Sequence, residues 1–100
     1  MSFIKRISLS LSLVLLVAIT TAQTVELTFT YWGSPFEKEA VEKMLTAFNE
    51  SHPDIQVRGQ HIPDAYFEKI STMVAGGTQP DVGYLGEANA LQWAQEGVLR

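Results

Sequence analysis

The stretch VELTFTYWGSPFEKEAVEKMLTAFNE, residues 25–50, decides the fold. Its first eight residues alternate between two faces and are rich in β-branched and aromatic side chains, which predicts a strand. The remainder predicts a helix, because Ser34 can cap its amino end, Pro35 suits the first helical position and Glu37 completes a capping box. Its apolar residues recur at helical spacing, and they are Phe36, Ala40, Val41, Met44, Leu45 and Phe48. The stretch therefore predicts a strand that leads directly into an amphipathic helix.

Two further strand–helix units follow this one. Their strands and helices are predicted in turn over residues 55–60, 63–76, 82–85 and 88–96. Asp64 is expected to cap the first of these helices, Gly76-Gly77 to end it, and Leu91 and Trp93 to pack. Strands joined through helices of this length lie parallel, with right-handed crossovers. The prediction is an α/β fold, the β-α-β-α-β-α start of a doubly wound parallel sheet.

Residues 1–22 have the three zones of an export signal. Lys5 and Arg6 form a positive start, residues 7–19 are mostly apolar, and Ala22 ends a run of small residues fit for a peptidase. The alternatives are a retained membrane anchor or a buried helix, but a span needs roughly 20 apolar residues. We predict a cleaved signal peptide at 1–22 and a mature domain at 23–100. No cysteine follows the cut to carry a lipid, which favours a secreted, periplasmic protein free of an anchor.

The charge of residues 23–100 excludes several partners. They carry all 11 acidic residues of the chain against five basic ones. A nucleic acid or an anionic membrane would not attract such a surface. The lack of cysteine excludes disulfides and thiolate metal sites, and no cofactor is expected. A three-stranded sheet of this size would leave its edges bare. We therefore expect the chain to be the amino-terminal part of a longer protein.

Four segments carry a resemblance to a known family. They are FTYWGSPFEKEAVEKMLTAFNE, SHPDIQV, FEKISTMVAGGTQPDVGYLG and LQWAQEGVL. In them the chain resembles the family 1 extracellular solute-binding proteins of ABC importers, the sugar-binding type. The resemblance implies the first part of lobe 1 of a type II periplasmic-binding-protein-like fold, with strand order 2-1-3. It also implies a monomer that captures a mono- or oligosaccharide between two lobes and delivers it to membrane permease subunits.

The candidate ligand site lies at the carboxyl ends of the first and third strands, because a ligand binds an open α/β sheet where the strand order reverses. These loops are residues 32–34 and 85–89, and the candidate residues in and beside them are Trp32, Gly33, Ser34, Glu37, Tyr84, Gly86, Glu87 and Asn89. The two aromatic rings suit a pyranose face, and the carboxylate of Glu87 can accept from sugar hydroxyls. Each has a plainer interpretation: the rings can be core residues, and the polar residues can be ordinary caps and first-turn residues.

Other functions stay open at this point. A secreted carbohydrate-active enzyme would need two carboxyl groups across one crevice, and Glu37 and Glu87 are the available pair. No nucleophile–base pair accompanies them, so we expect no enzymatic activity. An α/β regulator would cluster carboxylates after the first strand, where the chain has Trp32 and Gly33 instead. Binding of a polyamine, an anion or a metal is the remaining alternative, although His52 and His61 lack metal-ligand spacing.

Overall fold

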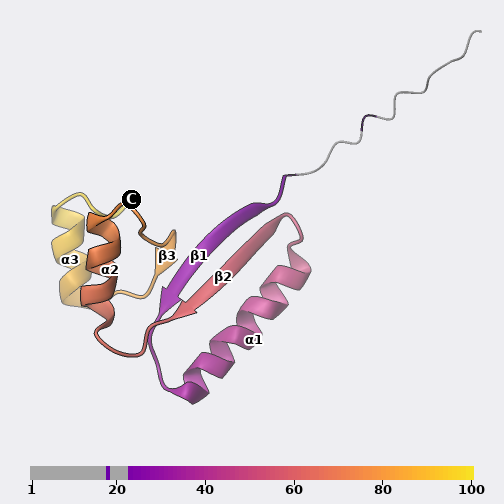
Figure 1. Cartoon of the computed structure of the whole chain (residues 1–100), viewed down its shortest axis with the longest axis horizontal. Coiled ribbons are helices and arrows are strands. Elements are labelled where there is room, and N and C mark those ends of the chain that lie inside the picture. Colours follow the sequence, from indigo (N-terminus) through magenta and orange to yellow (C-terminus); the bar gives the residue numbers. More distant parts are fainter. Residues whose placement is uncertain (1–17, 19–22) are drawn as a thin grey trace, which may run out of the picture.

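The computed structural model describes residue 18 and residues 23–100, so that the predicted signal peptide lies almost entirely outside the described residues. The described part is a three-stranded parallel sheet of order β2-β1-β3 with helices on both faces (Figure 1). Its elements are β1 Val25–Tyr31, α1 Pro35–Ser51, β2 Ile55–His61, α2 Tyr66–Ala75, β3 Val82–Gly83 and α3 Glu87–Gln95. The predicted α/β class, element order and strand order are confirmed. No helix of this described part is long and apolar enough to cross a membrane.

Helix α1 begins as its sequence predicts. Ser34 and Glu37 form the capping box and Pro35 occupies the first turn. The apolar stripe is divided, however: Val41 and Leu45 are half-buried, whereas Phe36 is 81% exposed. This division arises because the sheet has only three strands, and α1 lies along β2 at its edge (Figure 1).

The outer edge of β2 is held by a side chain from the end of α1. Asn49 Nδ2 donates to the carbonyl oxygen of Val57 at 2.9 Å, and Val57 N donates to Asn49 Oδ1 at 2.8 Å. This pair satisfies one donor and one acceptor that an edge strand otherwise exposes. Asn49 is the third and Val57 the last residue of the stretch AFNESHPDIQV, residues 47–57, so this pair of hydrogen bonds joins the end of α1 to β2 within that stretch.

Helix α2 begins two residues later than the proposed cap, so the prediction for Asp64 is wrong. The residue at the helix boundary is Ala65, in the left-handed conformation with φ 48°, and α2 has no side-chain cap hydrogen bond. The other end is as predicted. Gly77 has φ +73°, and Thr78 N and Gly77 N donate to the carbonyl oxygens of Met73 and Val74 at 2.8 and 3.2 Å. This is the Schellman pattern that a glycine stop allows.

The third unit is shorter in its strand and shifted in its helix. Strand β3 has two residues instead of four, and α3 begins one residue early. Trp93 packs, with its ring 5.2 Å from that of Phe67 between α3 and α2. Leu91 does not pack, since it is 63% exposed. The prediction for Leu91 is wrong because α3 turns that face away from the sheet.

The short β3 is joined to β1 by the carboxylate of Asp81 as well as by the backbone pairing of the two strands. Asp81 Oδ2 accepts from Thr28 N at 2.8 Å and from Thr28 Oγ1 at 3.1 Å. Asp81 N donates in return to the carbonyl oxygen of Thr28 at 3.1 Å. Asp81 therefore fixes the start of β3 at the amino edge of the sheet, away from the predicted ligand loops.

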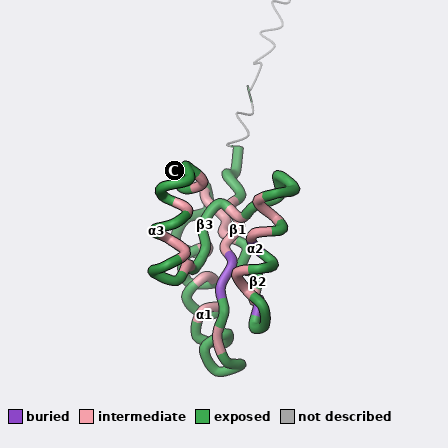
Figure 2. The backbone as a smooth tube through the Cα atoms, turned by 90° about the vertical axis from the view of Figure 1, so that its left-hand side faces the viewer, coloured by how far each residue is buried: buried purple, intermediate pink, exposed green. Residues whose placement is uncertain are grey.

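The buried core is small and lies near the carboxyl end of β1. Its members are Thr30, Tyr31, Ile62 and Ile70, each at most 4% exposed (Figure 2). Two glycines let neighbours approach closely there. A Cβ on Gly59 would lie 2.6 Å from Leu45 on the α1 face, and one on Gly83 would lie 2.6 Å from Thr30 on the α2 face. The best-packed part of the described chain thus supports the edge at which the candidate site lies.

Candidate functional site

The two candidate loops meet at the carboxyl edge of the sheet. The strand order places β3 directly beside β1, so the loops that leave them are neighbours. The rings of Trp32 and Tyr84, one from each loop, have their centroids 5.0 Å apart and are nearly perpendicular, at 76°. The structure therefore brings together the two aromatic residues that the sequence singled out.

Trp32 lies between two tyrosines. Its ring centroid is 4.9 Å from that of Tyr66, at the start of α2, and 5.0 Å from that of Tyr84. Edge-to-face contacts of this kind fix a ring's orientation. Trp32 and Tyr84 nevertheless remain 40% and 37% exposed, whereas Tyr31, whose ring centroid is 6.2 Å from that of Tyr84, is buried. The sequence left Trp32 open between packing and ligand contact, and its environment allows both, with one side packed and another in solvent.

Trp32, Tyr66 and Tyr84 together form an aromatic corner. Tyr66 is the one member that was not among the residues expected from the sequence. Its hydroxyl donates to the carbonyl oxygen of Thr30 at 3.1 Å and lies 2.9 Å from Thr30 Oγ1. Burial raises the pKa of Tyr66 above its ordinary value, so the hydroxyl remains a donor at neutral pH. The absence of a Cβ at Gly83 leaves room for this hydroxyl. Its position in the sequence could have indicated this role, because Tyr66 is the first aromatic residue after β2 and lies at the start of the following helix.

The loop between β1 and α1 is closely held. Gly33 has φ +136°, and a Cβ at this position would lie 2.5 Å from Glu37 Oε2. Ser34 N donates to that same oxygen at 2.6 Å, and Glu37 N donates to Ser34 Oγ at 3.2 Å. Glu37 therefore serves first as the second half of a capping box, which is the plainer of its two sequence interpretations.

His61, considered from the sequence only as a metal ligand, also contacts this loop. His61, the last residue of β2, places Nε2 2.7 Å from the carbonyl oxygen of Gly33. Its ring lies beside that of Tyr31, with centroids 5.4 Å apart. The sequence offered a signal, since His61 ends a parallel strand next to β1 and must reach the same edge of the sheet.

The loop between β3 and α3 is held more loosely. Gly86 lies at the helix boundary with an ordinary φ of −68°, and α3 has no side-chain cap hydrogen bond. Glu87 is exposed in the first turn of α3, and Asn89 is half-buried near Gly86. Glu87 keeps its carboxylate in solvent at the amino end of a helix, where a negative charge is favoured with or without a ligand.

This edge can recognise a polar ligand with apolar faces. It offers partly exposed aromatic rings, the amino ends of two helices and the exposed carboxylate of Glu87. Ring faces and hydrogen-bonding groups in one place are what a sugar requires. Within residues 23–100, the acidic and histidine side chains form no group of three that could hold a metal ion.

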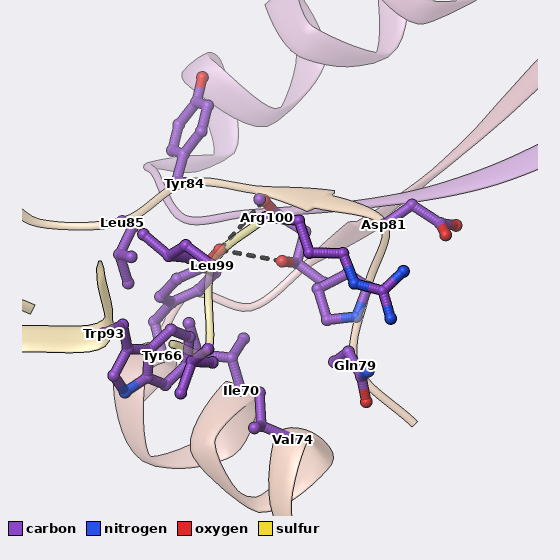
Figure 3. A pocket seen from close by; sticks show the side chains of 14 residues that line it. Tyr66, Ile70, Val74, Gln79, Asp81, Tyr84, Leu85, Trp93, Leu99 and Arg100 are labelled. Atoms are coloured by element: carbon purple, nitrogen blue, oxygen red, sulfur yellow. Dashed lines mark hydrogen bonds between the residues drawn. The ribbon is translucent and has the colours of Figure 1, made fainter. Parts of the chain in front are cut away.

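A cavity of about 440 Å³ lies between α2, α3 and the α2 face of β3 (Figure 3). Its walls include Ile70 and Val74 of α2 and Trp93 of α3. Tyr84 is the one predicted site residue that lines it, and Figure 3 shows the Tyr84 ring pointing away from those three side chains. The cavity is thus a gap beside β3 that adjoins the β3–α3 loop through Tyr84 and Leu85 and also has Tyr66 in its wall.

Comparison with known proteins identifies a family that matches most of this chain. A sequence profile described as bacterial extracellular solute-binding protein matches residues 28–100. A family 1 extracellular solute-binding protein from Alicyclobacillus acidocaldarius is 34% identical, with a TM-score of 0.71 over 75% of this chain and 19% of its own. An ABC substrate-binding protein from Listeria monocytogenes, solved with cycloalternan, is 34% identical, with a TM-score of 0.70 over 78% of this chain and 20% of its own.

A third solved structure is described as a periplasmic oligogalacturonide-binding protein. It comes from Yersinia enterocolitica and is 35% identical, with a TM-score of 0.55 over 59% of this chain and 15% of its own. The chain therefore spans at most about a fifth of the length of these three solved relatives. The matched residues correspond to one part of each of these longer relatives.

Proposed function

The chain belongs to the bacterial extracellular solute-binding protein family, and we propose from this premise that it captures a carbohydrate outside the cytoplasm. Residues 23–100 form the first part of lobe 1 of a two-lobed protein, and residues 1–22 are the signal that exports it. The ligand binds between the lobes, and the protein, a monomer, delivers it to the permease subunits of an ABC importer. It does so as a binding protein without a cofactor or a catalytic step.

The aromatic corner of Trp32, Tyr66 and Tyr84 is the observation that carries this proposal. A sugar ring presents an apolar face of C–H groups, and partly exposed aromatic rings bury that face without losing any of the sugar's hydrogen bonds. The neighbouring Glu87 carboxylate and the loop amides supply partners for the hydroxyl groups. The rings are oriented before a ligand arrives, which reduces the entropy cost of binding.

The solved relatives support a carbohydrate over a polyamine or an anion. One was solved with cycloalternan and another is described as an oligogalacturonide-binding protein. A polyamine would require several carboxylates at the edge, whereas the Glu37 carboxylate already accepts from Ser34 N within its own helix cap. The loops offer one free carboxylate, that of Glu87, which suits a neutral polyol better than a polycation.

Thermal unfolding of the full-length protein with a ligand panel tests the proposal. The panel contains maltotriose, cycloalternan, an oligogalacturonide, spermidine and sulfate. A sugar at one hundred times its Kd should stabilise the protein by about 2.7 kcal/mol. A shift with spermidine or sulfate and none with the sugars would contradict the carbohydrate proposal.

Two tryptophans of residues 1–100, replaced one at a time in the full-length protein and compared with the wild type, allow a test of where the sugar binds. Trp32 lies at the carboxyl edge and Trp93 lies between α2 and α3. A sugar on the aromatic corner should change the fluorescence of a Trp93→Phe variant, which keeps Trp32, and leave that of Trp32→Phe unchanged. Trp32→Ala should raise the Kd about tenfold, from the loss of roughly 1.4 kcal/mol of ring contact. A fluorescence change that follows Trp93 would place the ligand elsewhere.

A further inference from the structure

We propose that His61 is a positioning residue, which with Glu37 clamps one peptide group of the β1–α1 loop in its ligand-ready orientation. The inference rests on the proposed function, because it concerns the same edge of the sheet. His61 lies at the end of β2, outside the two loops from which ligand contacts are expected. Its effect on a ligand passes through the backbone of Gly33 and Ser34.

The clamp acts on a single peptide plane. The carbonyl oxygen of Gly33 and the N–H of Ser34 belong to the same peptide group and point in opposite directions. His61 Nε2 lies 2.7 Å from that oxygen, and Glu37 Oε2 lies 2.6 Å from that nitrogen. With both ends engaged, the plane cannot rotate without breaking a hydrogen bond.

The chemistry of the contact also assigns the tautomer of His61. A carbonyl oxygen only accepts, so the proton of this hydrogen bond must lie on Nε2. The ring is kept at this position by Tyr31, whose centroid is 5.4 Å away and which is 1% exposed. The donor is thus attached to the buried core, whereas Glu37 is exposed on α1.

The clamp is needed because of the backbone it holds. Gly33 has φ +136°, a region open to glycine but to few other residues. Glycine is the most flexible residue, and it directly follows Trp32, the centre of the aromatic corner. Fixing the Gly33–Ser34 peptide limits how the chain leaves β1, and so limits where Trp32 and the first amides of α1 point. A loop held in this way spends less entropy when a ligand binds.

The test compares His61→Leu with His61→Gln in the full-length protein. Both variants lose the ring beside Tyr31, but only glutamine keeps an N–H that can reach Gly33. With the panel sugar that stabilises the wild type most, calorimetric titration should give a Kd about fivefold higher for the leucine variant. The glutamine variant should stay within about twofold of the wild type. Equal losses in both variants, or none in leucine, would overturn the proposal.

His52→Leu is the matched control. His52 follows the carboxyl end of α1, where its ring stacks on Phe48 at 4.1 Å and its Nδ1 lies 3.0 Å from the carbonyl oxygen of that residue. It therefore makes the same kinds of contact as His61, but at the amino edge of the sheet. Its replacement should leave the Kd unchanged, and a loss equal to that of His61→Leu would show a general effect on folding.

Hydrogen exchange of the Ser34 amide, measured without any ligand, separates this proposal from the proposed function. The amide should exchange about fivefold faster in His61→Leu than in His61→Gln, because the freed peptide can rotate away from Glu37. Unchanged exchange would overturn the clamp whatever the protein binds. Faster exchange together with a wild-type protein that binds no panel sugar would uphold the clamp and reject the carbohydrate function.

Discussion

The loops after β1 and after β3 face the same edge of the sheet, but they are built differently. The β1–α1 loop is held by the capping box of Ser34 and Glu37 and by His61 on the Gly33 carbonyl. The β3–α3 loop follows a two-residue strand and enters its helix at Gly86 without a side-chain cap. One wall of the proposed site is therefore fixed by hydrogen bonds, and the other chiefly by the contacts of the Tyr84 ring.

In the proposed function, this difference would give the two loops different roles. A fixed wall presents Trp32 and the amides of α1 in one orientation, which lowers the cost of binding. A looser wall allows Glu87 and Asn89 to adjust to the pattern of hydroxyl groups on a ligand.

The largest expected effect comes from breaking the fixed loop at its glycine. Gly33→Ala should lower the free energy of unfolding by about 3 kcal/mol, because the new Cβ would be strained at φ +136° and would lie 2.5 Å from Glu37 Oε2. Gly86→Ala should change it by less than about 0.5 kcal/mol, since its φ is ordinary and the nearest atom is 4.0 Å away. Urea unfolding of both full-length variants measures the contrast, and similar losses would refute it.

A smaller effect is expected from removing one hydrogen bond of the cap. Ser34→Ala should cost about 1 kcal/mol, because the amide of Glu37 loses its acceptor at the start of α1. Glu87→Ala, at the start of α3, should cost less than about 0.5 kcal/mol, because its side chain is exposed and contributes only through the helix dipole. Thermal unfolding compares the two, and a larger loss in the Glu87 variant would show that the β3–α3 loop is the better-held one.

The smallest effect should come from giving the loose loop the cap that it lacks. Gly86→Ser places a hydroxyl at the helix boundary, where the backbone already has the extended φ −68° and ψ 150° of a cap residue. We expect a stabilisation of about 0.3 kcal/mol, as serine is slightly better than glycine there. Differential scanning calorimetry can resolve the change. A destabilised variant would mean that a close neighbour leaves no room for a side chain at this position.

Much of the fold could be predicted because its signals are local. The capping box at Ser34 and the glycine stop after α2 depend on residues a few positions apart, and both are confirmed. Asp64 failed as a cap because Ala65 takes a left-handed backbone that periodicity does not reveal. The prediction for Leu91 failed because the sequence of α3 does not show which of its faces is turned toward the sheet. Local patterns therefore located the elements better than they located their boundaries or buried faces.

The sequence by itself determined the order of strands and helices and the residues of the two edge loops, and the export signal before them stays a prediction. Only the tertiary structure decided which side chains meet there. The contacts of Tyr66 with Thr30, of His61 with Gly33 and of Asp81 with Thr28 join residues 28 to 53 positions apart. Such pairs are close because parallel strands bring their ends to common edges. The separation of two residues along the chain does not reveal that they are close in space. The family follows from the local pattern, and the shape of the proposed site follows from the sheet.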